Sequence, residues 1–374
     1  MGDLAGAPPA PAPFRAAVIG TGFGTRVHVP GLRLAGVEVV AIASRRAARA
    51  AAAAAALGIP AAFDDYRTML ATAQPDLVCV VTPPALHPEM VRAAVAGGAH
   101  VICEKPLAYD AARAWEMATL AARSGLVNAT NFQFRYWPAR VRFRELVRAG
   151  TIGELRLLRY VWTAPLRLDP AAPAHDWFAR RETGGGVLYN LGAHFFDFVR
   201  WCFGEVRAAT GALEAFVPRR ALPDGSGTAP VTADDTASVE LVLESGALVS
   251  CQLGFVTAGR RIAIEAYGAD GTLVLEDDRV LLAGRRPDAP LEAVPVAPPE
   301  PAEPKPLAPF VLLARDVVAR ATGGVPPLAG VDLPTFADGA RTQAVIDAVR
   351  GAAAGRRWLD VAREAPGGSE VRGG

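Results

Sequence analysis

A lysine in this chain stands where a catalytic cation would be needed. Lys105 follows the apolar run 101–103 and is itself followed by Pro106. The run predicts a short buried strand, and proline, which has no N–H, stops sheet pairing. The strand would therefore deliver Lys105 to the carboxyl edge of a sheet, where ligands bind in open α/β folds. The alternative is that Lys105 is a solvated loop charge.

A histidine and an amide stand where a proton could be exchanged. Asn190 and His194 are four residues apart in the segment 187–202, which predicts a helix opened by three glycines at 184–186. Positions four apart share a helix face, so both side chains can point into one cleft. The alternative is that His194 contacts a buried carbonyl. Trp177, in the aperiodic stretch 165–181, is a candidate wall of a substrate site.

A glycine turn follows the first apolar run of the chain, residues 14–19. Gly20, Gly22, Phe23 and Gly24 precede a predicted helix over 27–34. Gly20 permits a tight turn and Gly22 lets the backbone approach a pyrophosphate, which the free N–H groups of the helix start would bind. The third glycine of the dinucleotide motif is replaced by Thr25, so the match is incomplete.

The end of the second predicted strand, 37–43, lacks the acid that binds an adenosine ribose in NAD. The chain has Ser44, Arg45 and Arg46 there instead. Two guanidinium groups and a hydroxyl suit a 2′-phosphate, which favours NADP over NAD. The alternative is that both arginines merely begin the next helix, facing water.

A rigid loop follows the strand predicted over 76–81. It holds Thr82, Pro83 and His87, and it would lie on the same edge as Gly22 and Lys105. We expect this loop near the ribose or nicotinamide of the cofactor. His87 has the alternative of a helix-cap contact.

The elements that must position these residues alternate from 14 to 131, which predicts an α/β fold with a doubly wound parallel sheet of the Rossmann type. Further strands are predicted at 76–81, 101–103 and 127–131, and helices at 47–57, 64–71, 88–96 and 109–124. Residues 132–362 predict a second domain, with strands at 155–162, 237–243, 247–254, 262–267 and 271–275 and helices at 138–149, 309–321 and 335–354. We expect a loop over 285–309 and disordered tails at 1–13 and 363–374.

Composition narrows the class of protein. The 374 residues include 39 Lys and Arg against 38 Asp and Glu, a balance without the basic excess of a nucleic-acid or membrane binder. We find neither a signal peptide nor an apolar run of membrane-spanning length. The four cysteines are scattered in apolar segments, which predicts reduced thiols in a cytoplasmic protein, and the histidines lack metal-ligand spacing.

Taken in order, these motifs resemble the Gfo/Idh/MocA oxidoreductases over roughly residues 14–362. The resemblance rests on Gly20-Thr21-Gly22-Phe23-Gly24, Thr82-Pro83-Pro84 with His87, Glu104-Lys105-Pro106, Asn131-Phe132-Gln133-Phe134-Arg135-Tyr136, Gly184-Gly185-Gly186-Val187-Leu188, Gly192-Ala193-His194, Asp197 and Pro334-Thr335-Phe336-Ala337-Asp338-Gly339.

The resemblance implies an N-terminal Rossmann domain that binds NAD(P) and a C-terminal α/β domain with a large, mostly antiparallel sheet. It also implies a sugar, polyol or related cyclic substrate and a homodimer or homotetramer. Lys105 would be the catalytic lysine beside the nicotinamide, and His194 would exchange a proton with the substrate hydroxyl. Glu104 would either orient Lys105 or contact the cofactor, and Pro106 would fix the backbone, with a cis bond as one alternative.

One position departs from the family pattern, which commonly has aspartate where this chain has Asn190. An amide can hydrogen-bond a hydroxyl but cannot accept a full proton. The departure leaves open a different substrate, a reductive direction or a weak enzyme. Two rival functions also stay open: elimination or glycoside cleavage assisted by a tightly held cofactor, and a non-catalytic NADP(H)-binding protein.

Overall fold

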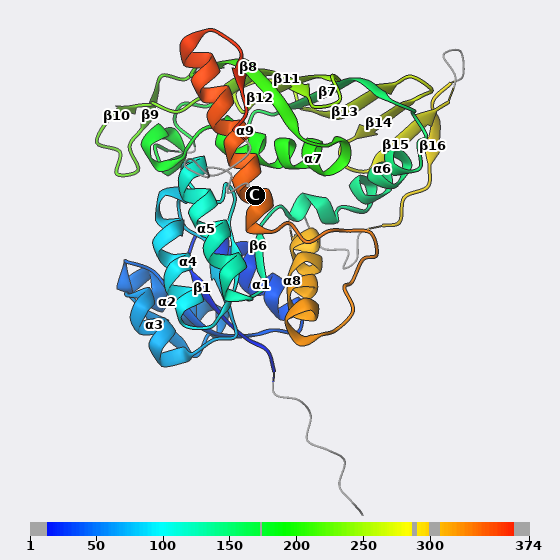
Figure 1. Ribbon diagram of the computed structural model, residues 1–374. Helices are drawn as coiled ribbons and strands as arrows, with labels where there is room; N and C mark the ends of the chain where they lie inside the picture. The colour runs from blue at the N-terminus through cyan, green and yellow to red at the C-terminus, as the bar shows by residue number, and fades with distance from the viewer. Residues whose placement is uncertain (1–12, 173, 286–289, 299–306, 363–374) are drawn as a thin grey trace, which may run out of the picture.

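The computed structural model describes residues 13–172, 174–285, 290–298 and 307–362 (Figure 1). The tails expected at 1–13 and 363–374 lie outside these ranges, apart from Pro13, as do residues 286–289 and 299–306 of the expected loop.

The first domain is built on a six-stranded sheet in the order β3-β2-β1-β4-β5-β6, with every neighbouring pair parallel. This confirms the predicted doubly wound Rossmann sheet. The strands are β1 (Arg15–Ile19), β2 (Glu38–Ala43), β3 (Ala61–Phe63), β4 (Leu77–Val80), β5 (His100–Cys103) and β6 (Asn128–Thr130). They are short and almost wholly buried in the centre, because helices cover both faces.

Helices cover the two faces of this sheet in separate groups (Figure 1). One group contains α3 (Tyr66–Ala73), α4 (His87–Ala96) and α5 (Ala111–Ser124), whose buried side chains share one core. The other contains α1 (Val29–Leu34) and α8 (Leu307–Thr322), which lie side by side, and α2 (Ala47–Leu57), whose buried Ala54 belongs to the same core as theirs. Residues 307–322 were expected to belong to the second domain. They pack on the first because Gly31 leaves room for the Phe310 ring, which a Cβ there would meet at 2.4 Å.

The second domain contains a nine-stranded sheet in the order β16-β15-β14-β13-β7-β12-β11-β8-β17. Every neighbouring pair is antiparallel except β7 and β12, which confirms the expected mostly antiparallel sheet. The strands are β7 (Leu155–Thr163), β8 (Val206–Glu214), β11 (Thr236–Leu243), β12 (Leu248–Gly254), β13 (Arg261–Gly268), β14 (Thr272–Glu276), β15 (Val280–Gly284), β16 (Glu292–Val294) and β17 (Leu359–Asp360). A small hairpin of β9 (Arg219–Ala221) and β10 (Thr228–Pro230) stands apart.

Three helices lie against one face of this sheet or cross between the domains (Figure 1). These are α6 (Pro138–Arg148), α7 (Ala193–Phe203) and α9 (Phe336–Gly355). Helix α9 packs on α5 of the first domain and on α7 and β8 of the second, so it holds the two together. In the described ranges, no helix is long and apolar enough to cross a membrane, and no three His, Cys, Asp or Glu side chains gather as a metal site.

Candidate active site

The glycine turn lies at the switch point of the first sheet, where β1 has β2 on one side and β4 on the other. Gly20 has φ +121°, and a Cβ there would lie 2.1 Å from the backbone oxygen of Val81, so only glycine fits. A Cβ on Gly22 would meet no atom within 4 Å. The open space above Gly22 fits the predicted approach of a pyrophosphate, and Phe23 and Gly24 follow directly.

The helix after the turn begins unusually. Residues Gly24–His28 form a π-helical turn, η1, before α1 starts.

At the end of β2, the side chains of Arg45 and Arg46 are exposed and Ser44 is half-buried, which leaves both guanidinium groups accessible at the same sheet edge.

The loop after β4 is held from behind by His87. This side chain has no exposed surface, and its two ring nitrogens lie 2.7 Å from the Thr82 carbonyl oxygen and 3.1 Å from that of Leu107. Burial lowers the pKa of His87, although both carbonyls and Glu104 oppose the shift. A side chain without exposed surface does not reach a bound cofactor. His87 therefore supports the loop, whereas Thr82 and Pro83 are half-buried at its surface.

Lys105 joins the two domains at the edge of the first sheet. It follows β5, the Lys105–Pro106 bond is cis, and its Nζ donates to the backbone oxygen of Asn190 at 3.2 Å. Burial lowers the pKa of Lys105, and the charge of Glu104 opposes that shift. The lysine is therefore not a solvated loop charge.

Glu104 is held by three donors. Its Oε1 accepts from His28 Nε2 at 2.7 Å and from Asn131 Nδ2 at 2.6 Å, and its Oε2 accepts from the Lys105 backbone N–H at 3.2 Å. Burial acts to raise the pKa of Glu104, but His28, Lys105 and Asn131 together hold it below the usual value. The carboxylate thus stays ionised next to Lys105.

His194 lies in a different setting. Its ring is 6% exposed and stacks on Phe134, with centroids 4.0 Å apart and planes 12° apart. Its Nδ1 is buried without a hydrogen-bond partner among the described residues. Burial lowers the pKa of His194 well below its usual value, and the positive charges of Lys105 and Arg140 add to the effect. His194 is therefore a neutral imidazole at physiological pH.

The helix that carries His194 also begins with a π-helical turn. The turn η6 covers Leu188–Gly192 and leads into α7. The predicted single helix over 187–202 is thus two joined pieces, with Asn190 in the first and His194 in the second. Asn190 meets Lys105 through its backbone carbonyl.

The glycines before this turn serve close packing. A Cβ on Gly184 would lie 3.0 Å from Pro84, one on Gly185 2.3 Å from the Phe178 oxygen, and one on Gly186 2.5 Å from Asp234. The Asp234 carboxylate accepts from the Leu188 N–H at 2.8 Å, and burial raises its pKa to about 6. The glycines therefore bring the start of η6 against the loop after β4 and against Asp234.

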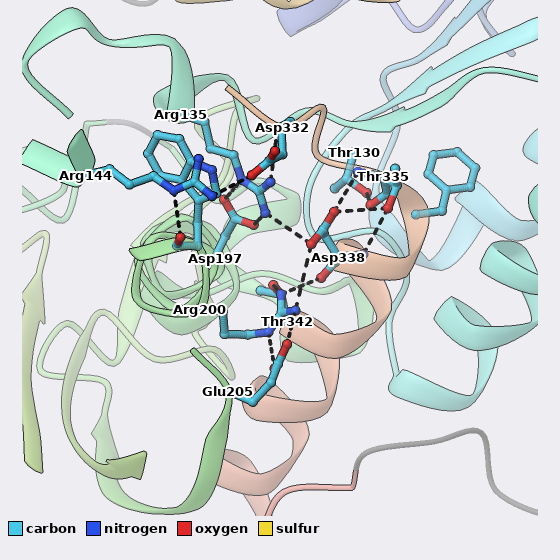
Figure 2. A network of polar contacts seen from close by, with 12 residues as sticks. Thr130, Arg135, Arg144, Asp197, Arg200, Glu205, Asp332, Thr335, Asp338 and Thr342 are labelled. Carbon is cyan, nitrogen blue, oxygen red and sulfur yellow. Dashed lines mark hydrogen bonds and ion pairs between the residues drawn. The ribbon is translucent and has the colours of Figure 1, made fainter. Parts of the chain in front are cut away.

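A buried ion-pair network anchors α7 (Figure 2). Asp197, three residues after His194, accepts from Arg135 Nε at 2.8 Å and Nη2 at 2.5 Å. Arg135 Nη2 also lies 3.3 Å from Asp338, which caps α9 in a capping box with Thr335. Asp197 is therefore a structural anchor that ties α7 to α9.

The structure brings Lys105, Glu104, Asn190 and the glycine turn to the carboxyl edge of the first sheet. The positive charge of Lys105 lies close enough to His194 to lower its pKa. Trp177 stays apart. It is 39% exposed, and its contacts run to Phe178 and Thr183. Sequence reasoning missed His28 and Asp234. Asn131 was noted only as part of a motif, although its place at a strand end was a usable signal.

Comparison with known proteins identifies the family. Residues 14–132 match the model of an oxidoreductase family with an NAD-binding Rossmann fold, and residues 141–274 match the model of the GFO/IDH/MocA C-terminal domain.

Individual relatives agree with these matches. An uncharacterized oxidoreductase of Synechocystis is 34% identical over 71% of this chain and 72% of its own length. The dTDP-3,4-didehydro-2,6-dideoxy-alpha-D-glucose 3-reductase of Streptomyces violaceoruber is 32% identical over 67% of this chain and 68% of its own. The structure of a levoglucosan dehydrogenase in complex with NADH and L-sorbose superposes with a TM-score of 0.82 at 25% identity, covering 94% of this chain and 99% of that one. The chain therefore belongs to the GFO/IDH/MocA family of NAD(P)-dependent oxidoreductases.

Proposed function

We propose that this oxidoreductase transfers a hydride between a nicotinamide cofactor, preferably NADP, and a hydroxyl or keto carbon of a sugar, polyol or related cyclic substrate. The observation that carries the proposal is the 3.2 Å contact between Lys105 Nζ and the Asn190 carbonyl. It brings the lysine at the cofactor edge against the helical turn that leads to His194. The sugar substrates in the names of the relatives support the substrate class.

The roles of the residues follow from charge development at the reacting oxygen. The bound nicotinamide supplies or accepts the hydride. In reduction, negative charge grows on the carbonyl oxygen, where the Lys105 ammonium would stabilise it at short range. The imidazolium form of His194 would then give that oxygen the proton that completes the hydroxyl. In oxidation, neutral His194 accepts the hydroxyl proton. Its lowered pKa keeps it available as a base.

The cofactor edge fits a dinucleotide. The turn at Gly20 and the open space above Gly22 would hold the pyrophosphate, with Phe23, Gly24, Thr82 and Pro83 around it. Ser44, Arg45 and Arg46 would bind a 2′-phosphate. We expect NADPH to bind more tightly than NADH, and Arg45→Ala to narrow that difference. Equal affinities in the parent protein, measured by fluorescence titration, would refute the NADP preference.

The decisive experiment is a spectrophotometric screen of NADPH and NADH oxidation with keto-sugars, an inosose and nucleotide-linked keto-sugars, and of the reverse reaction with polyols. Lys105→Met should bind cofactor like the parent protein and lose about 10²–10³-fold in kcat. Turnover of this variant near the parent rate would remove Lys105 from the mechanism.

Assembly and location belong to the same proposal. Leu157 and Leu248 are paired across β7 and β12 and are 36% and 53% exposed. Tyr160 of β7 stacks on Phe195 of α7, so Leu157, three positions away on the strand, lies on the face of the large sheet opposite to α7. We propose that this face joins two copies in a homodimer or a homotetramer. The four free thiols, three of them buried, suit a cytoplasmic protein. Light scattering of the parent and of Leu248→Glu tests the assembly.

A further inference from the structure

A buried histidine contacts Glu104, the residue before Lys105. His28 closes the π-helical turn after the glycine turn, and its side chain has no exposed surface. The centroid of the Phe310 ring lies 4.2 Å from the centroid of the His28 ring, and the centroid of the Phe23 ring lies 5.9 Å from it. The imidazole is thus fixed by packing, with Nε2 directed at Glu104.

The contact between His28 and Glu104 has a defined direction. A carboxylate only accepts hydrogen bonds, so His28 Nε2 carries the proton in the 2.7 Å contact with Oε1. The same oxygen accepts from Asn131, whose backbone N–H donates to the Cys103 carbonyl at the end of β5. Two donors therefore hold one carboxylate oxygen on the side of the first domain.

This arrangement decides where the Lys105 ammonium points. Glu104 is the adjacent residue and the nearest source of negative charge, yet Lys105 Nζ donates across the domain boundary to Asn190. We propose that His28 is a positioning residue for Lys105: by holding the Glu104 carboxylate, it keeps the lysine ammonium directed at the substrate side of the site. This inference rests on the proposed role of Lys105.

Three variants of His28 test the proposal. Leucine removes the donor, asparagine keeps polarity but is too short to reach Glu104, and glutamine places an amide N–H near the position of Nε2. Loss of a hydrogen bond to a charged group predicts a fall in kcat of about tenfold to a hundredfold for leucine and asparagine. Glutamine should stay within about threefold of the parent, and all three should keep the parent KM and cofactor affinity.

A second readout needs no turnover. The rate of Lys105 acylation, followed by mass spectrometry on the whole protein, should fall in the leucine variant, because a freed Glu104 pairs with the ammonium and raises its pKa. The glutamine variant should react like the parent. His100→Leu is the matched control, since this histidine accepts a hydrogen bond from Val127 at the opposite end of β5. It should leave both readouts unchanged.

The outcomes separate the two proposals. Equal losses in the leucine and glutamine variants, or a leucine variant with parent kcat and parent acylation rate, would overturn the positioning role. A fall in kcat matched by an equal loss of cofactor affinity would also overturn it. A parent protein without turnover on the whole panel would defeat the proposed function, and the acylation rates would still decide whether His28 controls Lys105.

Discussion

Lys105 and His194 occupy surroundings of opposite character. The backbone N–H of Lys105 ends a chain of hydrogen bonds that runs through the Glu104 carboxylate to His28 and Asn131. His194 is oriented by an aromatic ring, and its buried Nδ1 has no partner in the described ranges. The hydrogen bonds to Glu104 stabilise its ionised form and so keep a negative charge next to Lys105. Stacking fixes a direction but leaves the imidazole neutral and free to gain or lose a proton.

The first way to test this difference is to remove the proton-exchanging group and keep its packing. His194→Phe retains a ring that can stack on Phe134 but cannot carry a proton. We expect kcat to fall by about 10²–10⁴-fold, with the melting temperature unchanged within a few degrees. Steady-state kinetics and thermal unfolding measure the two quantities. A variant with parent kcat would show that another group exchanges the proton.

The second is to remove the ring that orients His194. Phe134→Leu loses the stacked contact at 4.0 Å. An aromatic pair of this kind predicts a loss of roughly two- to tenfold in kcat. Phe134→Tyr keeps the ring and should behave like the parent, and Lys105 acylation should be the same in all three proteins. A leucine variant as active as the tyrosine variant would contradict the role of stacking.

The third gives His194 a charged neighbour. Asn190→Asp introduces a carboxylate four residues before His194. A negative charge nearby favours the imidazolium, so the pKa of His194 should rise from its lowered value. His194 then becomes protonated at a higher pH, so the acid limb of the pH–rate profile for oxidation should move to higher pH. An unshifted limb would show that position 190 does not act on His194.

The fourth and smallest effect concerns Lys105. Its charge is lost as pH rises through its pKa, which Glu104 holds up against the effect of burial. Glu104→Gln removes that charge, so the pKa of Lys105 should fall and the basic limb of the pH–rate profile should move to lower pH. A limb that stays in place would indicate that it belongs to another group.

The first domain was more predictable from sequence than the second. The predicted helix over 47–57 agrees with α2 residue for residue, because an alanine-rich run ends at Gly58 in the left-handed region. Strand β3 was missed, since its three residues carry no apolar alternation. Strand β8 was missed because Gly211 interrupts its pattern. The glycine is needed in the strand, since a Cβ there would lie 2.7 Å from the Ser238 backbone oxygen.

The site was predictable where a residue sits at a strand end. Lys105 follows β5 as expected, and the fold positions it by topology alone. The partners of the charged groups were not predictable. His28 and Glu104 are 76 positions apart, and nothing local reveals which face of a helix a histidine occupies. The two π-helical turns could not be predicted from the sequence either, because they depend on packing and no residue pattern marks them.

The join between β6 and α9 has a consequence for how the protein is made. Strand β6 is an edge of the first sheet, and at its end the Thr130 N–H donates to the Pro334 oxygen while the Thr130 hydroxyl donates to Thr335, 205 positions later. A ribosome needs roughly 10 to 40 seconds to add that many residues. Throughout that interval the nascent Rossmann sheet exposes an unfinished edge, the kind of surface on which strands of other chains pair. The closing of this edge is therefore the step of synthesis at which we expect the protein to depend most on chaperones.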